Sequence, residues 1–169
     1  MKSPEIINRV ANSALITINL EDYYPVGARK VFDIKDWLYK GLVLREKEFR
    51  TFLESHEWDD YQNTYIALCC SSDAVIPAWA FMLVSLKLSE VAKQVVVGDL
   101  EVLETTLYQN IINNLDLRHC ENKAVIVKGC SEKPVPQNAY LFLIDKLKPI
   151  AKSILYGEAC SSVPLYKKK

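Results

Sequence analysis

Short apolar runs alternate with longer amphipathic segments from residue 60 to the end of the chain. The runs that predict strands are Tyr65–Cys70, Gln94–Val97, Ala124–Lys128 and Ser153–Tyr156. Each is short and continuously apolar, as strands buried on both faces tend to be. Helices are predicted between them at Ile76–Val91, Leu100–Leu115 and Gln137–Ile150, the last two with apolar residues at helical spacing. This alternation is typical of βαβ units and predicts an α/β fold: a doubly wound, mainly parallel sheet with helices on both faces.

The first 59 residues follow a different pattern. Ala14–Leu20 and Lys30–Ile34 are β-branched and extended in character, and the turn-rich sequence between them allows the two to pair as a hairpin. Glu46–Glu57 has an apolar stripe with charges on the other side, which predicts an amphipathic helix. We therefore expect a small N-terminal strand and helix extension over residues 1–59. It packs on an α/β core domain over residues 60–169, and the two form one compact unit.

The predicted helix Ile76–Val91 is apolar nearly all round, with the sequence AWAFMLV at its start. A helix on the surface of a globular protein normally shows a polar face. Either this helix is buried under the N-terminal extension, or it pairs with the same helix of a second subunit in a homodimer.

Three strand-like runs end in a Cys-Ser pair that is followed by a proline a few residues later. The cysteines are Cys70, Cys130 and Cys160, and three of the five glycines, Gly98, Gly129 and Gly157, also fall at strand ends. Ligands of open parallel sheets bind beyond the carboxyl ends of the strands. If the four strands have the spatial order second, first, third, fourth, the three thiols converge, and Asp99 joins them from the end of the second strand.

Three thiolates at one edge suit zinc, or an iron–sulfur cluster whose fourth site is open or filled by another group. Asp99 is the candidate for that fourth position. The spacing contains no CxxC motif, and buried cysteines also behave as small hydrophobic residues, so ordinary packing stays open as an alternative. Cys69 points to the opposite face of its strand from Cys70 and is expected in the core.

Two further functions fit the same residues. In a thiol enzyme or persulfide carrier, Cys130 would be the nucleophile, because it lies between Gly129 and the opening of a helix, whose N-terminus lowers a thiol pKa. In a non-catalytic homo-oligomeric interaction protein, the cysteines are packing residues and the helix Ile76–Val91 forms the interface. Whether the protein is an enzyme is therefore left open.

Charge and motifs exclude several classes of protein. The chain has 21 basic and 21 acidic residues, so no general positive field attracts nucleic acid or anionic membrane. Its longest apolar run, Ala74–Val84, is too short to span a bilayer, and the start of the chain has no signal-peptide core. We expect a cytoplasmic protein with reduced cysteines. The phosphate-binding GxGxxG and GxxxxGK[ST] motifs and the catalytic GxSxG and HExxH motifs are absent.

Segments along the whole chain resemble one family of proteins. They are NRVANSALITINLEDYYP, LVLREKEFRTFL, AVIPAWAFMLV, VVVGDLEVLE, VKGCSEKPVP and YGEACSSVPLYKKK. On these segments the chain is similar to DUF2480, an uncharacterised family typical of Bacteroidetes that has no assigned activity. The resemblance also implies that relatives are encoded near genes of the SUF iron–sulfur assembly system. It therefore implies iron–sulfur assembly proteins as partners.

Overall fold

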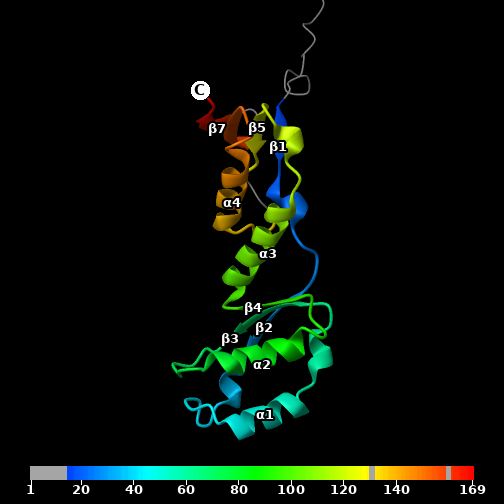
Figure 1. Cartoon of the computed structure of the whole chain (residues 1–169), viewed down its shortest axis with the longest axis vertical. Coiled ribbons are helices and arrows are strands. Elements are labelled where there is room, and N and C mark those ends of the chain that lie inside the picture. The colour runs from blue at the N-terminus through cyan, green and yellow to red at the C-terminus, as the bar shows by residue number, and fades with distance from the viewer. Residues whose placement is uncertain (1–14, 130–131, 159–160) are drawn as a thin grey trace, which may run out of the picture. The chain divides into compact units, whose positions relative to one another are not determined.

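The computed structural model describes residues 15–129, 132–158 and 161–169. The chain divides into two compact units. The middle unit is Pro25–Leu107, and the terminal unit combines the chain up to Tyr24 with Tyr108–Lys169. The helix α3 (Leu100–Asn114) supplies residues to both units (Figure 1). No helix within the described ranges is long and apolar enough to cross a membrane.

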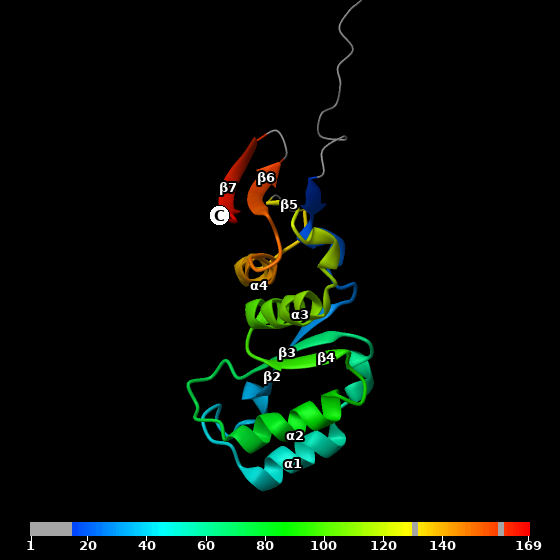
Figure 2. The same cartoon turned by 45° about the horizontal axis from the view of Figure 1, so that its top comes forward.

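The middle unit is built on a three-stranded parallel sheet with the order β2-β3-β4. The strands are β2 (Arg29–Asp33), β3 (Tyr65–Cys69) and β4 (Gln94–Val97), and the helices α1 (Glu46–Ser55) and α2 (Ala78–Leu88) connect them. Ile66 and Leu68 of β3 are buried against α1 and α2, whereas Ala67 is buried against α3. Successive residues of a strand face opposite sides, so helices cover both faces of this sheet. Figures 1 and 2 show α1 alongside α2.

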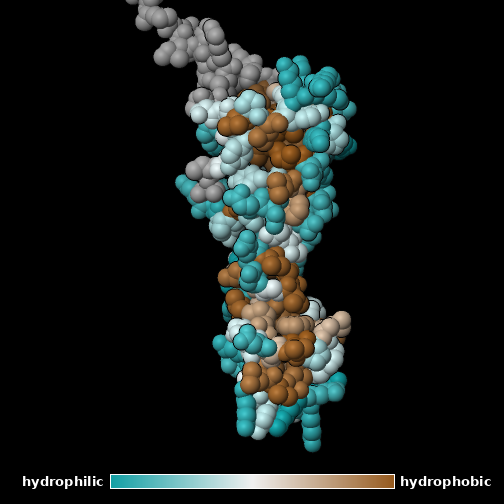
Figure 3. Space-filling model, turned by 90° about the vertical axis from the view of Figure 1, so that its left-hand side faces the viewer, coloured by the Kyte–Doolittle hydropathy of each residue, from teal (hydrophilic) through white to brown (hydrophobic). Residues whose placement is uncertain are grey.

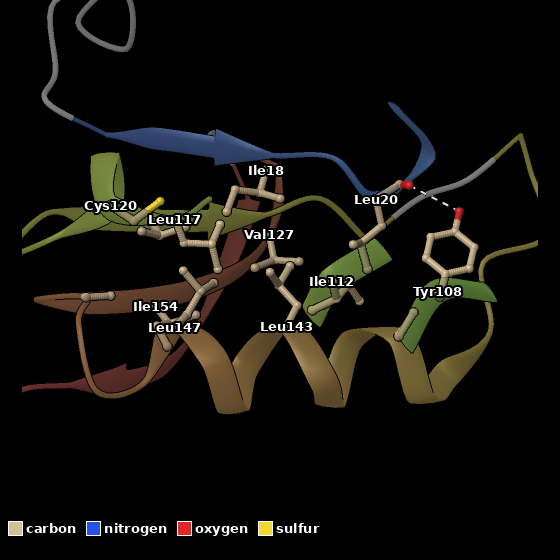
Figure 4. Close-up of a cluster of buried hydrophobic side chains, with 13 residues drawn as sticks. Ile18, Leu20, Tyr108, Ile112, Leu117, Cys120, Val127, Leu143, Leu147 and Ile154 are labelled. Atoms are coloured by element: carbon tan, nitrogen blue, oxygen red, sulfur yellow. Dashed lines mark hydrogen bonds between the residues drawn. The ribbon is translucent and has the colours of Figure 1, made fainter. Parts of the chain in front are cut away.

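The terminal unit has a four-stranded sheet with the order β1-β5-β6-β7. The strands are β1 (Ile16–Ile18), β5 (Ala124–Val127), β6 (Ser153–Glu158) and β7 (Ser161–Lys167); the first three are parallel and β7 is antiparallel to β6. The helix α4 (Gln137–Leu147) connects β5 to β6. Its Leu143 and Leu147 and the Ile112 side chain of α3 are buried against Val127 and Ile154 of the sheet (Figure 4).

The core of the terminal unit includes a buried tyrosine. Tyr108 of α3 is fully buried, and its hydroxyl donates a hydrogen bond of 3.1 Å to the Leu20 carbonyl oxygen at the end of the β1 segment (Figure 4). A buried phenol needs such a partner. The bond fixes the segment that follows β1 against α3.

The predicted α/β class is confirmed: both sheets are mainly parallel, and helices connect the strands. The four predicted strands and three predicted helices from residue 60 onward occur with ends that differ by a few residues. The predicted hairpin is wrong, because β1 pairs with β5 and β2 pairs with β3, both in parallel. Residues 29–33 are therefore a strand of the sheet that contains β3. The strand β7 was not predicted.

Among the described residues, α1 and β3 cover one side of the apolar helix α2. Its Ala80, Val84 and Leu88 are buried in a cluster with residues of α1, so the helix predicted over Glu46–Glu57 supplies this cover. Met82 and Leu86, on another side of α2, remain 63% and 64% exposed. The N-terminal segment therefore covers only part of the α2 surface.

Candidate functional site

Asp33 closes β2 at the carboxyl end of the middle sheet and binds the segment that follows β3. Its Oδ1 accepts hydrogen bonds from the backbone N–H of Ser71 and of Lys35, both at 3.0 Å. Its Oδ2 accepts a third from the Ser71 hydroxyl at 2.5 Å. Partial burial by itself raises the pKa of Asp33, but these hydrogen bonds outweigh burial and leave the pKa below its usual value. The ionised carboxylate thus ties the ends of two neighbouring strands together.

Replacing Asp33 by asparagine is expected to lower the free energy of unfolding by about 1–2 kcal/mol at neutral pH, because the charge-assisted bonds are lost. A carboxyl with a lowered folded-state pKa stabilises the protein above its unfolded pKa of about 3.9 and loses this effect as the pH falls through the folded value. The difference between variant and parent should therefore shrink below about pH 4. Urea unfolding at several pH values measures it. Asp36→Asn, at an exposed position nearby, is the control and should change little. An effect of Asp33→Asn that does not vary with pH would contradict this assignment.

Cys69 and Cys70 follow one another at the end of β3 but have different surroundings. Burial raises the pKa of the Cys69 thiol, and the nearby charges of Asp33 and Asp99 raise it further. Cys70 packs against the hydrophobic cluster of α1 and α2, and its thiol lies 4.0 Å from the Ser72 carbonyl oxygen as a weak donor. Both cysteines are partly buried. Cys70 contacts the core cluster, and Cys69 lies where the charges of Asp33 and Asp99 act on it.

Asp99 lies just beyond the end of β4, as predicted, and directly precedes α3. Its Oδ1 accepts a hydrogen bond of 2.9 Å from the Val102 backbone N–H, the bond that an N-cap side chain makes. Its charge also acts on Cys69. The carboxyl edge of the middle sheet thus brings Asp99 near Cys69, with Cys70 as the next residue. Cys69 stays protonated near neutral pH unless a cation displaces its proton.

A second edge forms at the carboxyl ends of β5 and β6 in the terminal unit. These are neighbouring parallel strands, with Val127 opposite Tyr156. Just beyond them, Lys128 Nζ lies 3.5 Å from Glu158 Oε1, and the Tyr156 hydroxyl donates to the Gly129 carbonyl oxygen at 3.1 Å. The chain after β5 is therefore in direct contact with the end of β6.

The Tyr156 ring lies so close to Gly129 that any side chain at residue 129 would displace it. A Cβ atom on Gly129 would lie 2.3 Å from Cζ of the Tyr156 ring, far inside contact distance. The ring is also held edge-on by Tyr140 of α4, with centroids 5.8 Å apart. The close approach of the Tyr156 ring therefore accounts for a glycine at this strand end.

The segment after β5 is also attached to the end of β1. The Lys133 backbone N–H donates to Glu21 Oε1 at 2.9 Å, and Lys133 Nζ donates to the Glu21 carbonyl oxygen at 3.1 Å. Glu21 lies in the short helical turn Leu20–Tyr23 that follows β1. Contacts on both sides therefore fix the described flanks of residues 130–131.

Cys130 and Cys160, two of the three predicted ligands, lie outside the described residues. The strand order on which the three-thiol site depended is wrong, since β3 pairs with β2 and β4, and β5 pairs with β1 and β6. Two strand pairs of the predicted order are nevertheless correct: β3 pairs with β4, and β5 pairs with β6. The sheets thus bring the strand ends before Cys130 and Cys160 together, but give no reason to add Cys70.

Cys120 is a core residue. It is fully buried among the side chains of the terminal unit, close to Leu117 (Figure 4), and burial raises its thiol pKa. A nucleophile must be accessible and ionised. Cys120 is neither.

The sequence pattern gave no sign of an aromatic cluster around His56. The His56 ring packs against Phe32, Trp37 and Trp58 and stacks on Tyr61. The Tyr61 hydroxyl lies 3.2 Å from the imidazole Nε2. Burial lowers the pKa of His56. These residues come from β2, the two short turns around α1 and the end of α1, so only tertiary structure assembles them. The aromatic rings of this group pack against the hydrophobic core of the middle unit. The group therefore supports the fold.

The described parts of the two edges do not by themselves form a metal site. Across residues 15–129, 132–158 and 161–169, no three or more His, Cys, Asp or Glu side chains are grouped so that they could hold a metal ion. Cys130 and Cys160 are not among these residues.

The fold and its two polar edges define a small α/β protein with mainly parallel sheets. The chain belongs to a family described as protein of unknown function (DUF2480), whose family model matches residues 4–168. No curated protein and no solved structure matched the chain.

Proposed function

We propose that this protein is a metal-binding accessory protein, for zinc or an iron–sulfur centre, in which Cys130 and Cys160 are ligands. One observation supports this most: the strands that precede the two cysteines, β5 and β6, are parallel neighbours whose ends are in contact. Cys130 comes directly after Gly129, and Cys160 is the second residue after Glu158. Because these two strand ends are in contact, the thiols of the cysteines that follow them can bind the same metal ion.

A pair of thiols is half of a tetrahedral zinc site or of the usual ligand set of a small iron–sulfur cluster. The remaining positions would be filled by a carboxylate of the same edge, such as Glu158, or by ligands of a partner protein. An incomplete ligand set suits a protein that passes a metal or cluster to another protein. The iron–sulfur assembly proteins implied by the family resemblance are the partners proposed for this step.

Cys70 and Asp99 are not needed for this pair of thiols. Cys70 packs on a hydrophobic cluster and follows a strand of the other sheet. Asp99 uses one carboxylate oxygen to cap α3. Their role as metal ligands stays a prediction.

A second candidate function is thiol chemistry, with Cys130 as the nucleophile or persulfide carrier. The observation that favours it is that burial raises the pKa of both Cys69 and Cys120. These two thiols are therefore protonated near neutral pH, and a reactive thiol must be one of the other three.

The test measures metal content and the ultraviolet–visible spectrum of protein purified without oxygen or chelator, for the parent and for each of the five Cys→Ser variants. We expect Cys130→Ser and Cys160→Ser each to lose most of the bound zinc or iron, because each removes half of the thiol pair. Cys120→Ser and Cys69→Ser are the controls and should retain it. Full metal retention in both Cys130→Ser and Cys160→Ser would rule the proposal out. A metal-free parent in which Cys130 is alkylated much faster than the other thiols would support the second candidate instead.

A further inference from the structure

The strand β4 is an edge of the middle sheet that has no feature against pairing with another strand. It ends the order β2-β3-β4 and has the sequence QVVV, without proline or charge. Gly98 donates its backbone N–H to the Leu68 carbonyl oxygen of β3. Along a strand, every second residue directs its backbone N–H and C=O groups to the same neighbouring strand. Since Gly98 bonds to β3, Val95 and Val97 direct these groups away from β3. An edge of this kind is a template for another strand.

A hydrophobic groove of about 570 Å³ runs beside this edge. Its lining is formed by Val97 and by one side of α2, namely Ala78, Phe81, Met82, Ser85, Leu86 and Ser89, and contains no charged residue. Val97 is 53% exposed, and at the start of α3 Leu100 and Val102 are each 43% exposed. The middle unit carries large hydrophobic areas on its surface (Figure 3). Monomeric proteins rarely expose large contiguous apolar patches.

The charges at the ends of β4 match a second copy of the same strand. In an antiparallel pairing about a two-fold axis at Val96, each Val95 lies opposite Val97 of the second copy. Lys93 then lies opposite Asp99 of the second copy, so exposed residues of opposite charge flank both ends of the strand pair. Lys93 Nζ donates to the Val26 carbonyl oxygen at 2.8 Å and Asp99 Oδ1 accepts from the Val102 N–H, so the charges complement each other without a direct ion pair. The same register pairs the outward backbone groups, since Val95 and Val97 are the two residues that present them. Opposite charges directly across a strand pair stabilise it, whereas like charges would not.

Other edge strands of this protein carry features that oppose pairing. The edge strand β7 carries Pro164, and the ladder between β6 and β7 has an irregularity between Ile154 and Leu155. Proline and bulges are the usual means by which an edge strand avoids pairing. The other edge strand of the middle sheet, β2, carries Arg29, Lys30 and Asp33. Compared with β2 and β7, β4 is an edge strand with neither charge nor proline.

We propose that β4 pairs antiparallel with β4 of a second copy of this chain, about a two-fold axis at Val96. The two three-stranded sheets join into one sheet of six strands. The α2 helices then lie side by side on one face of that sheet. Met82 and Leu86 of each copy fill the groove of the other, which covers the side of α2 that α1 leaves exposed. A two-fold interface of this type places the same patch on both subunits.

The first test is sedimentation equilibrium of the full chain, comparing the parent with Val97→Lys. We expect the parent to be a dimer and Val97→Lys to dimerise at least about tenfold more weakly, which corresponds to about 1.4 kcal/mol, because a charge enters the strand pair. Val163→Lys, at a similarly exposed valine of β7, is the matched control and should leave the dimer unchanged. A monomeric parent, or a dimer unaffected by Val97→Lys, would overturn the proposal.

A second variant tests the register and remains informative if Val97→Lys does not fold. Directly opposite residues of a non-hydrogen-bonded antiparallel pair have Cα atoms about 4.5 Å apart, which is within the range that a disulfide spans. Under mild oxidation, Val96→Cys should therefore form a disulfide that joins the substituted positions of two copies. Peptide mass spectrometry without reduction distinguishes it from bonds of the native cysteines, and Val163→Cys is the control. A stable dimer without this cross-link would refute the register.

Discussion

Replacing Arg29 by alanine is expected to lower the free energy of unfolding by about 3–5 kcal/mol, the usual cost of removing one partner of a buried ion pair. Arg29 of β2 bonds Glu104 of α3 through two nitrogens, at 2.6 Å from Nε and 3.2 Å from Nη2. Each side chain of the pair is only 13% exposed. The alanine variant would leave the Glu104 carboxylate with little water and without its cation.

The guanidinium does more than neutralise Glu104. Its Nη1 donates to the carbonyl oxygens of Pro25 and Gly27 at 2.7 and 2.6 Å, and the group lies over the Tyr65 ring at 5.1 Å from the centroid. Arg29 thus joins α3, the chain that enters β2, and β3. Because lysine cannot reproduce a planar fork with several fixed donors, Arg29→Lys should recover only a small part of the lost stability.

Urea unfolding followed by circular dichroism measures this effect, and the chain offers a matched control. Arg50 pairs with Glu46 one turn away on α1, but their side chains are 53% and 62% exposed. Exposed pairs of this kind contribute about 0.3–0.5 kcal/mol. Arg50→Ala should therefore be nearly neutral. If Arg29→Ala were as mild as Arg50→Ala, the buried pair would not be the contact that holds α3 to this sheet.

Local patterns in the sequence were sufficient for the fold class and the elements, but not for the division into two sheets. The run Gln94–Val97 is a strand with those bounds, and the helix predicted from Gln137 begins there. Nothing in the residues of β1 distinguishes pairing with β2 from pairing with β5. Both β2 and β5 are short strands in parallel pairing, and the choice depends on contacts far apart in sequence, such as that of Tyr108 with Leu20. The predicted hairpin failed for this reason.

The candidate site, too, could be predicted from local patterns only where its strands are consecutive in sequence. The neighbours β5 and β6 are consecutive strands joined by one helix, so the sequence could predict that the strand ends before Cys130 and Cys160 meet. Adding Cys70 needed β3 and β5 to be adjacent strands of one sheet, which they are not. Asp33 could have been found by the rule that identified Asp99, since it also closes a strand. It was overlooked because its strand was assigned to an extension outside the sheet.

Replacing Gly129 by alanine is expected to cost about 2–3 kcal/mol of stability, the upper part of the range for overpacking. The new methyl group would meet the Tyr156 ring at 2.3 Å from Cζ and 2.5 Å from the hydroxyl oxygen. The ring cannot turn aside freely, because its hydroxyl is bonded to the Gly129 carbonyl and Tyr140 packs against its side. We therefore expect the methyl group to push Tyr156, and with it the end of β6, away from the end of β5.

A double-mutant cycle tests this cause. Tyr156→Ala removes the atoms that collide, so Gly129→Ala should cost much less in that background, with a coupling energy of about 1–3 kcal/mol. Equal costs of Gly129→Ala in both backgrounds, measured by urea unfolding, would mean that the ring is not the obstacle.

The same variant links stability to the proposed thiol pair. Since Gly129 directly precedes Cys130 and Tyr156 lies on the strand that leads to Cys160, separating the two strand ends should also separate the two thiols. We expect Gly129→Ala to lose bound metal under conditions where it is still folded. Leu143→Ala, which removes a fully buried side chain of α4 at a cost of about 2–5 kcal/mol, is the control of similar stability and should keep its metal. If both variants lost metal in proportion to their stability, the contact between Gly129 and Tyr156 would support the fold alone; loss confined to Gly129→Ala would connect it to the site.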